Sequence, residues 1–463
     1  MFRMPPTLGQ LGATHLTGGR GSRRAALLAT ALALAGFALV AGCPPAQPAP
    51  GPVFNNTTDP TNGGASFIGS AACSACHADI AELSSLHGHS FMLNPIAGAP
   101  PEYPVQAERA GAPDPPAEKT FDDVSYVIGG YTHDVSYVIG GYTHYALFVR
   151  TDGFLMTDGT EGVPTQWNLA FPANGTQAGF VPFMPGQAEP LPYAFDCFRC
   201  HTVGPQPQTA ASPLSQDNRP GILGTWAEPG VRCEACHGPG SNHVPRPSAR
   251  DLFVDSSAQA CGRCHTEGDD PEVILAAGGF IVANTQFAEL RASGGHANFA
   301  CTVCHDPHAS STYDAARGIR NACTVCHPDR GLAAHAGVTF TRGDYSEPVT
   351  CQSCHMPFAT LTASVATAAI VGEAGRMADT RTHIFRINVN PVPYTALFTA
   401  DQTRVEKDEQ GRAAVPLGFV CMRCHNDAAT PNSAFPLGLD IASEIAADMH
   451  TKFDGGVLKD RTP

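Results

Sequence analysis

One five-residue pattern constrains this chain more than any other feature, because it recurs eight times. The pattern is Cys-x-x-Cys-His, met first at Cys73, Cys76 and His77, and it contains all of the seventeen cysteines except Cys43. Two cysteines at this spacing present both sulfurs from a single turn of chain, and the following histidine can swing beneath a flat group held by them. This is the attachment pattern of c-type haem, in which the histidine is the proximal iron ligand.

The eight copies predict eight covalently bound c-type haems with iron. Zinc ribbons and disulfides are the alternatives, but zinc sites need no histidine at a constant offset, and such short spacings are unusual for structural disulfides. The predicted attachment residues are Cys73, Cys76, Cys197, Cys200, Cys233, Cys236, Cys261, Cys264, Cys301, Cys304, Cys323, Cys326, Cys351, Cys354, Cys421 and Cys424. The predicted proximal ligands are His77, His201, His237, His265, His305, His327, His355 and His425.

The composition agrees with a core made largely of haem. The chain has 47 glycines and 40 prolines, and 43% of its residues are apolar, which favours irregular chain over long regular elements. We predict a mainly α and irregular multihaem cytochrome in which the haems form much of the core. Between the first two motifs, β-branched and aromatic residues at 124–128 and 145–150 predict a small β-hairpin region around 121–160.

The histidines outside the motifs bear on function, because an iron ligated on both sides carries electrons whereas an iron with one free side can bind substrate. His243 and His308 lie too close in sequence to their own motifs to reach the opposite face of the same haem, so each is expected to ligate a neighbouring one. His87 competes with His89, and we prefer His89. The predicted distal ligands are His89, His243, His296, His308, His335, His383, His450 and His144.

The segment DVSYVIGGYTH occurs twice without change, at 123–133 and at 134–144. This identity indicates a recent duplication and not a solenoid, which needs several diverged repeats. An insert of eleven residues would exchange the two faces of a strand that took it up in register, so we expect one copy to loop out. Only one of His133 and His144 is therefore expected to be a ligand.

The N-terminus predicts export and a lipid anchor. Three arginines at 20–24 precede an apolar stretch at 25–40, and small residues lead to Cys43, as in a bacterial lipoprotein signal whose cysteine is acylated. Pro44 favours sorting to the outer membrane. The predicted divisions are a signal peptide at 1–42, a disordered tether at 43–66, a region with two motifs and the β segment at 67–205, and a six-motif cytochrome region at 206–463.

The chain is acidic, with a net charge of −14 that becomes −18 without the four arginines of residues 1–42. The sequence contains no basic patch of the kind that binds nucleic acid. An acidic surface favours docking with basic redox partners. We expect a membrane-bound electron donor and a periplasmic or outer-membrane acceptor, met on the periplasmic face of a membrane.

The motifs resemble those of the cytochrome c554 family, which is kin to hydroxylamine oxidoreductase and pentahaem nitrite reductase. The most specific stretch is GTWAEPGVRCEACHGPGSNHV at 224–244, and the other matching stretches are 73–91, 137–156, 195–204, 301–310, 351–357 and 382–388. The resemblance implies electron transfer through stacked haems and distal ligands at His89, His243, His308 and His383. The chain departs from these kin because no motif ends in lysine, as at the catalytic haem of the nitrite reductases, and no counterpart of the tyrosine crosslink of hydroxylamine oxidoreductase can be identified.

Two functions follow from these patterns. The first is an octahaem electron carrier with closely packed haems, most of them ligated by two histidines. The alternative is an oxidoreductase that acts on a small nitrogen or sulfur compound, such as nitrite, hydroxylamine or tetrathionate, at one haem with a free axial position. The number of histidines favours the carrier.

Overall fold

The computed structural model describes residues 64–96, 103–111, 124–128, 144–159, 162–248, 252–454 and 457–458. The chain divides into two units, residues 1–41 and 42–463, and every described residue belongs to the second. The predicted signal peptide, Cys43, most of the predicted tether and His133 lie outside the described residues. Within the described part, no helix has the length and apolarity needed to cross a bilayer.

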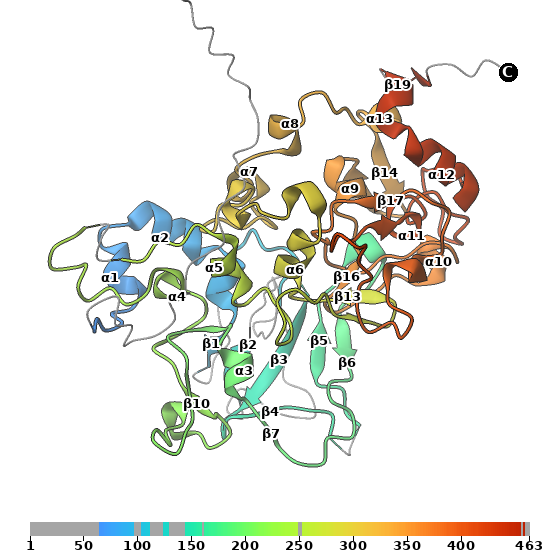
Figure 1. Ribbon diagram of the computed structural model, residues 1–463. Helices are drawn as coiled ribbons and strands as arrows, with labels where there is room; N and C mark the ends of the chain where they lie inside the picture. Colours follow the sequence, from blue (N-terminus) through green and yellow to red (C-terminus); the bar gives the residue numbers. More distant parts are fainter. Residues whose placement is uncertain are drawn as a thin grey trace, which may run out of the picture. The chain divides into compact units, whose positions relative to one another are not determined.

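The described α-helices are short, and the longest, α12, has nine residues. A mainly α architecture is therefore not confirmed (Figure 1). Most of the helices contain or flank a single Cys-x-x-Cys-His motif. The α-helices are α1 (Ser70–Ser74), α2 (Ala78–Ser85), α3 (Phe195–Phe198), α4 (Cys233–His237), α5 (Ala258–Gly262), α6 (Gln286–Arg291), α7 (Ala315–Gly318), α8 (Cys323–Cys326), α9 (Cys351–His355), α10 (Ala368–Val371), α11 (Leu417–Val420), α12 (Leu439–Ala447) and α13 (Met449–Lys452). The 3₁₀ helices are η2 (Gly88–Phe91), η4 (Pro172–Asn174), η5 (Gln216–Asn218), η6 (Gly294–His296), η7 (Cys301–Val303), η8 (Ala333–His335) and η9 (Tyr394–Leu397).

The β region between the first two motifs is larger than the predicted hairpin. It is a seven-stranded antiparallel sheet in which β1, β2, β3, β4 and β7 are consecutive neighbours, while β5 pairs with β3 and β6 (Figure 1). The short strands outside 121–160 carry little sequence signal, because several have only two residues. The strands are β1 (Asn94–Pro95), β2 (Val124–Ile128), β3 (Tyr145–Arg150), β4 (Phe154–Leu155), β5 (Gln166–Asn168), β6 (Gly179–Val181) and β7 (Leu191–Pro192).

Six smaller sheets connect the rest of the described chain. One of them, β8–β11, crosses the division expected at 205–206 and joins the second motif to the stretch before the third, while β9–β10 lies wholly on the C-terminal side of that division. Their strands and the others are β8 (Thr202–Val203), β9 (Gln206–Pro207), β10 (Gly224–Thr225), β11 (Glu228–Pro229), β12 (Ala276–Ala277), β13 (Phe280–Val282), β14 (Thr339–Arg342), β15 (Tyr345–Pro348), β16 (Thr360–Leu361), β17 (Ile387–Asn388), β18 (Val415–Pro416), β19 (Phe453–Asp454) and β20 (Val457–Leu458).

The sheet and the second motif share one apolar core. Phe148 of β3 packs in the same cluster as Tyr193, Phe198 of α3 and Trp226. At the edge of this cluster, a Cβ on Gly224 would lie 2.1 Å from the Gln206 carbonyl oxygen, so the close β9–β10 approach requires glycine there. The sheet thereby fixes the position of α3 and of the motif that follows it.

Candidate functional site

Each motif forms one tight turn of chain. The backbone N–H of His77 donates to the Cys73 carbonyl at 3.0 Å, and the equivalent bond recurs in the motifs of His265, His305, His327 and His425. Residues three apart on such a turn are neighbours, so both cysteine side chains of a motif leave the chain on one side. The local fold therefore presents two sulfurs together, as haem attachment requires.

Seven motif histidines have a second histidine opposite them. Each partner comes from another part of the chain, and the ring centres lie close to 6 Å apart in every pair. The distances are 6.3 Å for His77–His243, 6.2 Å for His89–His265, 6.2 Å for His237–His308, 5.9 Å for His296–His327, 6.2 Å for His305–His383, 5.9 Å for His355–His450 and 6.0 Å for His335–His425.

These separations fit an iron bound between two imidazoles. A bond from a metal to an imidazole nitrogen is about 2 Å long, and a five-membered ring with sides of about 1.33 Å places each nitrogen about 1.1 Å from the ring centre. Two rings on one iron therefore have centres about 6.2 Å apart. Rings in direct contact would lie closer, as His87 and His89 do at 4.3 Å.

Hydrogen bonds at Nδ1 leave the other ring nitrogen for iron. Nδ1 of His237, His355 and His425 lies 3.1, 2.9 and 2.8 Å from backbone carbonyl oxygens. Among the distal residues, Nδ1 of His243 and His450 contacts carbonyls at 3.1 and 3.2 Å. A carbonyl only accepts, so Nδ1 must donate and Nε2 keeps the lone pair that a metal needs.

Burial keeps many of these imidazoles neutral. Burial lowers the pKa of His201 to about 4 and that of His383 to about 3. It also lowers the pKa of His237, His265 and His305 below the ordinary value of histidine. A neutral imidazole is the form that ligates iron, so the residues fit the haems that the sequence predicts.

His201 differs from the other motif histidines on both sides. No described histidine lies opposite its ring, and His133 lies outside the described residues. On the proximal side its Nδ1 lies 3.0 Å from the hydroxyl of Tyr193, a buried side chain between β7 and α3. Sequence reasoning missed Tyr193, because one aromatic residue before a motif carries no periodic signal.

His144 is the one predicted distal ligand that the structure does not place opposite a motif histidine. Its Nε2 lies 3.2 Å from the Thr380 hydroxyl and its Nδ1 lies 3.5 Å from the Asp379 carboxylate. Asp379 also accepts hydrogen bonds from three successive backbone N–H groups at 362–364. The side chain of His144 therefore lies against Thr380 and Asp379 and not against a motif histidine.

His87 and His89 differ in their positions. His89 faces His265, whereas Nδ1 of His87 accepts a hydrogen bond from the His89 backbone N–H at 3.0 Å. His87 therefore begins the short η2 helix and orients the chain that carries His89.

Cysteines of different motifs lie against one another. The thiols of Cys200 and Cys264 lie close enough to shift each other's pKa, as do those of Cys261 and Cys301. Besides burial, Cys233 raises the pKa of Cys73 and Cys351 raises that of Cys323. Since each sulfur would hold the edge of one haem, these contacts bring the edges of neighbouring haems together. The motif of His265 touches two others, including that of His201.

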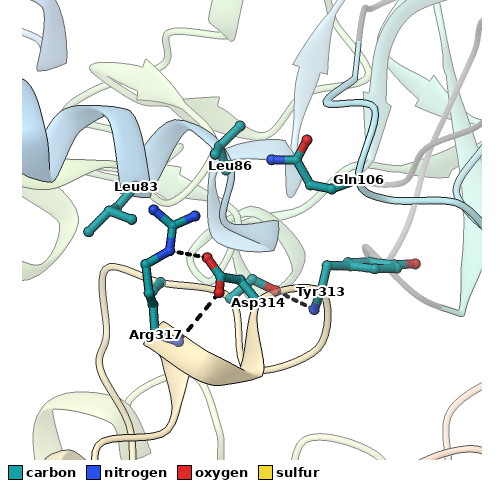
Figure 2. A pocket seen from close by; sticks show the side chains of 8 residues that line it. Leu83, Leu86, Gln106, Tyr313, Asp314 and Arg317 are labelled. Atoms are coloured by element: carbon teal, nitrogen blue, oxygen red, sulfur yellow. Dashed lines mark hydrogen bonds and ion pairs between the residues drawn. The ribbon is translucent and has the colours of Figure 1, made fainter. Parts of the chain in front are cut away.

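A cavity of about 160 Å³ lies apart from the motifs (Figure 2). Leu83 of α2, Leu86 just after it and Gln106 line one side, and Tyr313, Asp314 and Arg317 line the other. The Asp314 carboxylate is paired with Arg317. No motif cysteine or motif histidine lines it, so it is not a continuation of the His201 site.

Comparisons with known proteins identify the fold. No family model matches the sequence, and no curated protein matches it. Among solved structures, the octahaem sulfite reductase MccA of Wolinella succinogenes has a TM-score of 0.51 and 16% identity, covering 85% of this chain and 72% of that one. The outer cell wall cytochrome OcwA (TM-score 0.40, 17% identity, 70% and 80% covered) and an undecahaem S-layer cytochrome of Carboxydothermus ferrireducens (0.34, 15%, 86% and 59%) are more distant. The specific resemblance to cytochrome c554 stays a prediction, and the likeness to MccA shows that this chain has the fold of a multihaem cytochrome.

Proposed function

We propose that this chain is an octahaem oxidoreductase that reduces a small oxyanion at the iron held by His201, and that the other seven haems carry electrons to it. One observation carries the proposal: seven motif histidines face a second imidazole, and His201 faces none among the described residues. Iron ligated by two histidines transfers electrons, whereas iron with a free axial position can bind substrate.

The substrate class is a sulfur or nitrogen oxyanion, with sulfite as the first compound to test. Support comes from the likeness in fold to a protein described as a sulfite reductase. In such a reaction an S–O or N–O bond breaks and the oxygen leaves as water. The electrons come from a low-potential donor through the paired haems, and the protons come from solvent.

The residues around the His201 motif suit this role. The contact of Cys200 with Cys264 gives a direct route for electrons from the neighbouring motif. Burial, with the nearby Glu267 and Cys197, raises the pKa of Tyr145 at the start of β3. Tyr145 therefore keeps its proton at neutral pH and presents a neutral hydroxyl near this motif.

A spectrum of the oxidised protein tests the proposal. We expect electron paramagnetic resonance to show low-spin signals together with a high-spin signal from one haem, and sulfite, nitrite or hydroxylamine to change only the latter. His308→Ala is the matched control, because it removes the partner of His237 and must add a second high-spin signal.

Two outcomes would contradict the proposal. An entirely low-spin spectrum would make the chain an electron carrier, the function that the seven histidine pairs favour by themselves. A high-spin signal that grows in His133→Ala would show that His133 is the missing partner of His201.

The proposal includes export to the periplasmic face of a membrane through acylation of Cys43, with redox proteins as donor and acceptor. Its support is the sequence of residues 20–43. The test is detergent phase partitioning of the wild-type protein and of Cys43→Ser, in which only the wild-type protein should enter the detergent phase.

A further inference from the structure

Three arginines and one glutamate form a buried group, here called the Arg423 cluster. Arg423 is 1% exposed, and its Nη2 lies 2.7 Å from Oε1 of Glu347. Nη2 of Arg381 lies 3.9 Å from the same carboxylate. Arg342 donates to the Arg423 carbonyl at 3.2 Å, and Tyr345 donates to Glu347 at 2.6 Å. Residues distant in sequence thus converge on one carboxylate.

The cluster carries excess positive charge. Guanidinium groups stay protonated in proteins, so three arginines against one carboxylate leave a net charge of +2. Glu347 is the one described carboxylate that forms an ion pair with Arg381 or Arg423. The surplus charge is not neutralised within the described part of the protein.

Arg423 is also incompletely hydrogen-bonded. Its Nε and Nη1 atoms are buried and have no partner in the described part of the chain. Burying a guanidinium with unsatisfied donors is unfavourable, and a buried unsatisfied group in a native fold calls for a functional explanation.

The position of the cluster supplies that explanation. Arg423 stands between Cys421 and Cys424, and its Nη2 lies 3.4 Å from the carbonyl oxygen of Ser353, the residue before Cys354, so it lies beside the sulfurs of Cys354 and Cys424. Those sulfurs belong to the motifs of His355 and His425. Arg199 and Arg263 occupy the same place in their motifs but are only half-buried. Burial beside two attachment sites is therefore particular to Arg423 among these three.

We infer that the Arg423 cluster raises the reduction potentials of the two haems held by His355 and His425. Ferric haem with two neutral imidazoles carries one more positive charge than ferrous haem. A net positive charge nearby, in a medium of low dielectric constant, therefore favours the ferrous form. The cluster makes these two haems easier to reduce than their histidine ligation alone would. The inference rests on haem attachment at these two motifs and not on the free axial position at His201.

The test is a redox titration of the purified holoprotein followed by electron paramagnetic resonance. The imidazole planes lie 10° apart at His355–His450 and 73° apart at His335–His425, so the two sites should give different low-spin signals. Because His237–His308 is also near-parallel at 7°, its signal is first identified by its loss in His308→Ala. At a fixed applied potential, Arg423→Met should lower the ratio of reduced to oxidised haem at both sites by tenfold or more, and a tenfold change equals 59 mV for a one-electron couple.

Two further variants separate charge from structural damage. Glu347→Gln removes the negative charge and should shift both sites in the opposite direction, whereas Arg423→Lys keeps the charge and should shift them little. Arg263→Met, at the same motif position but half-buried, should leave both sites unchanged.

Equal shifts in Arg423→Met and Arg263→Met, or shifts of one sign in Arg423→Met and Glu347→Gln, would overturn the inference. Haem content per chain, measured by absorbance, shows separately whether attachment at the two motifs has failed. A change in the high-spin signal of His201 alone would concern the proposed function and not the cluster.

Discussion

At the scale of single residues, the surroundings of a motif histidine differ more than the motif itself. His237, His355 and His425 donate from Nδ1 to backbone carbonyls, whereas the partner of His201 is the hydroxyl of Tyr193. A hydrogen bond at Nδ1 makes an imidazole a stronger donor to its metal. The hydrogen-bond partner of Nδ1 therefore gives motifs of the same sequence imidazoles of different donor strength.

Tyr193→Phe should raise the reduction potential of the His201 haem. The substitution removes the acceptor of the Nδ1 proton, so the imidazole becomes less basic and stabilises ferric iron less. A hydrogen bond is worth about 1 kcal/mol, or about 40 mV for a one-electron couple. Potentiometric titration of the high-spin signal measures the shift, and the low-spin signals serve as internal reference. An unchanged potential would show that Tyr193 only packs against the motif.

At the scale of elements, buried carboxylates join segments that are far apart in sequence. Glu234 of α4 is 3% exposed and accepts hydrogen bonds from the backbone N–H groups of Gly69 at 2.8 Å and Gly240 at 2.7 Å. Glu289 of α6 accepts from the backbone N–H of His383 at 2.6 Å. Because these elements are short, such bonds and the haem ligands replace the side-chain packing that positions longer helices.

Glu234→Ala should destabilise the attachment of residues 68–70 to α4. The substitution leaves backbone donors without their charged acceptor, which costs about 3 kcal/mol. Hydrogen exchange at Ile68 and Gly69 should accelerate, and the thermal midpoint should fall. Glu228→Ala is the matched control, because the half-buried Glu228 contacts only Ser70 there and its loss should have a smaller effect. Equal effects of the two substitutions would contradict this role of Glu234.

The exact repeat offers a second test at this scale. Deleting 123–133 or 134–144 yields the same polypeptide, in which one copy still connects β2 to β3. Since each doubling of a loop costs only about 0.6 kcal/mol, the deletion should change the thermal midpoint slightly. The low-spin spectrum should stay the same, because neither His133 nor His144 is assigned to an iron. Loss of a low-spin signal would show that one of them is a ligand.

At the scale of the whole molecule, we expect haem to take the place of much of the apolar core. α1, α2 and α8 have no buried residue, although each adjoins or contains a motif. Apolar clusters exist around the sheet and around 274–420, and the paired histidines add links between distant segments elsewhere. Stability should therefore depend on haem unevenly along the chain.

Protein produced without haem attachment should show this unevenness. We expect the segments that contain α1, α2 and α8 to exchange amide hydrogens rapidly, because the ligand pairs that restrain them are missing. The segments that contain β3, β13 and β16 should keep more protection, since side chains form their core. Hydrogen exchange with mass spectrometry compares the two forms, and equal protection in both would contradict this role of haem.

The sequence by itself determined the attachment chemistry, since two cysteines and a histidine within five residues act through local geometry. It also indicated the region of the longest strands, β2 and β3, although the two-residue strands around them went undetected. Tertiary structure alone decided which histidine faces which motif, because the pairs join residues as distant as His77 and His243 or His355 and His450. The lack of a described histidine opposite His201 and the burial of Arg423 have the same origin: eight motifs of the same chemistry differ in what the fold brings against them.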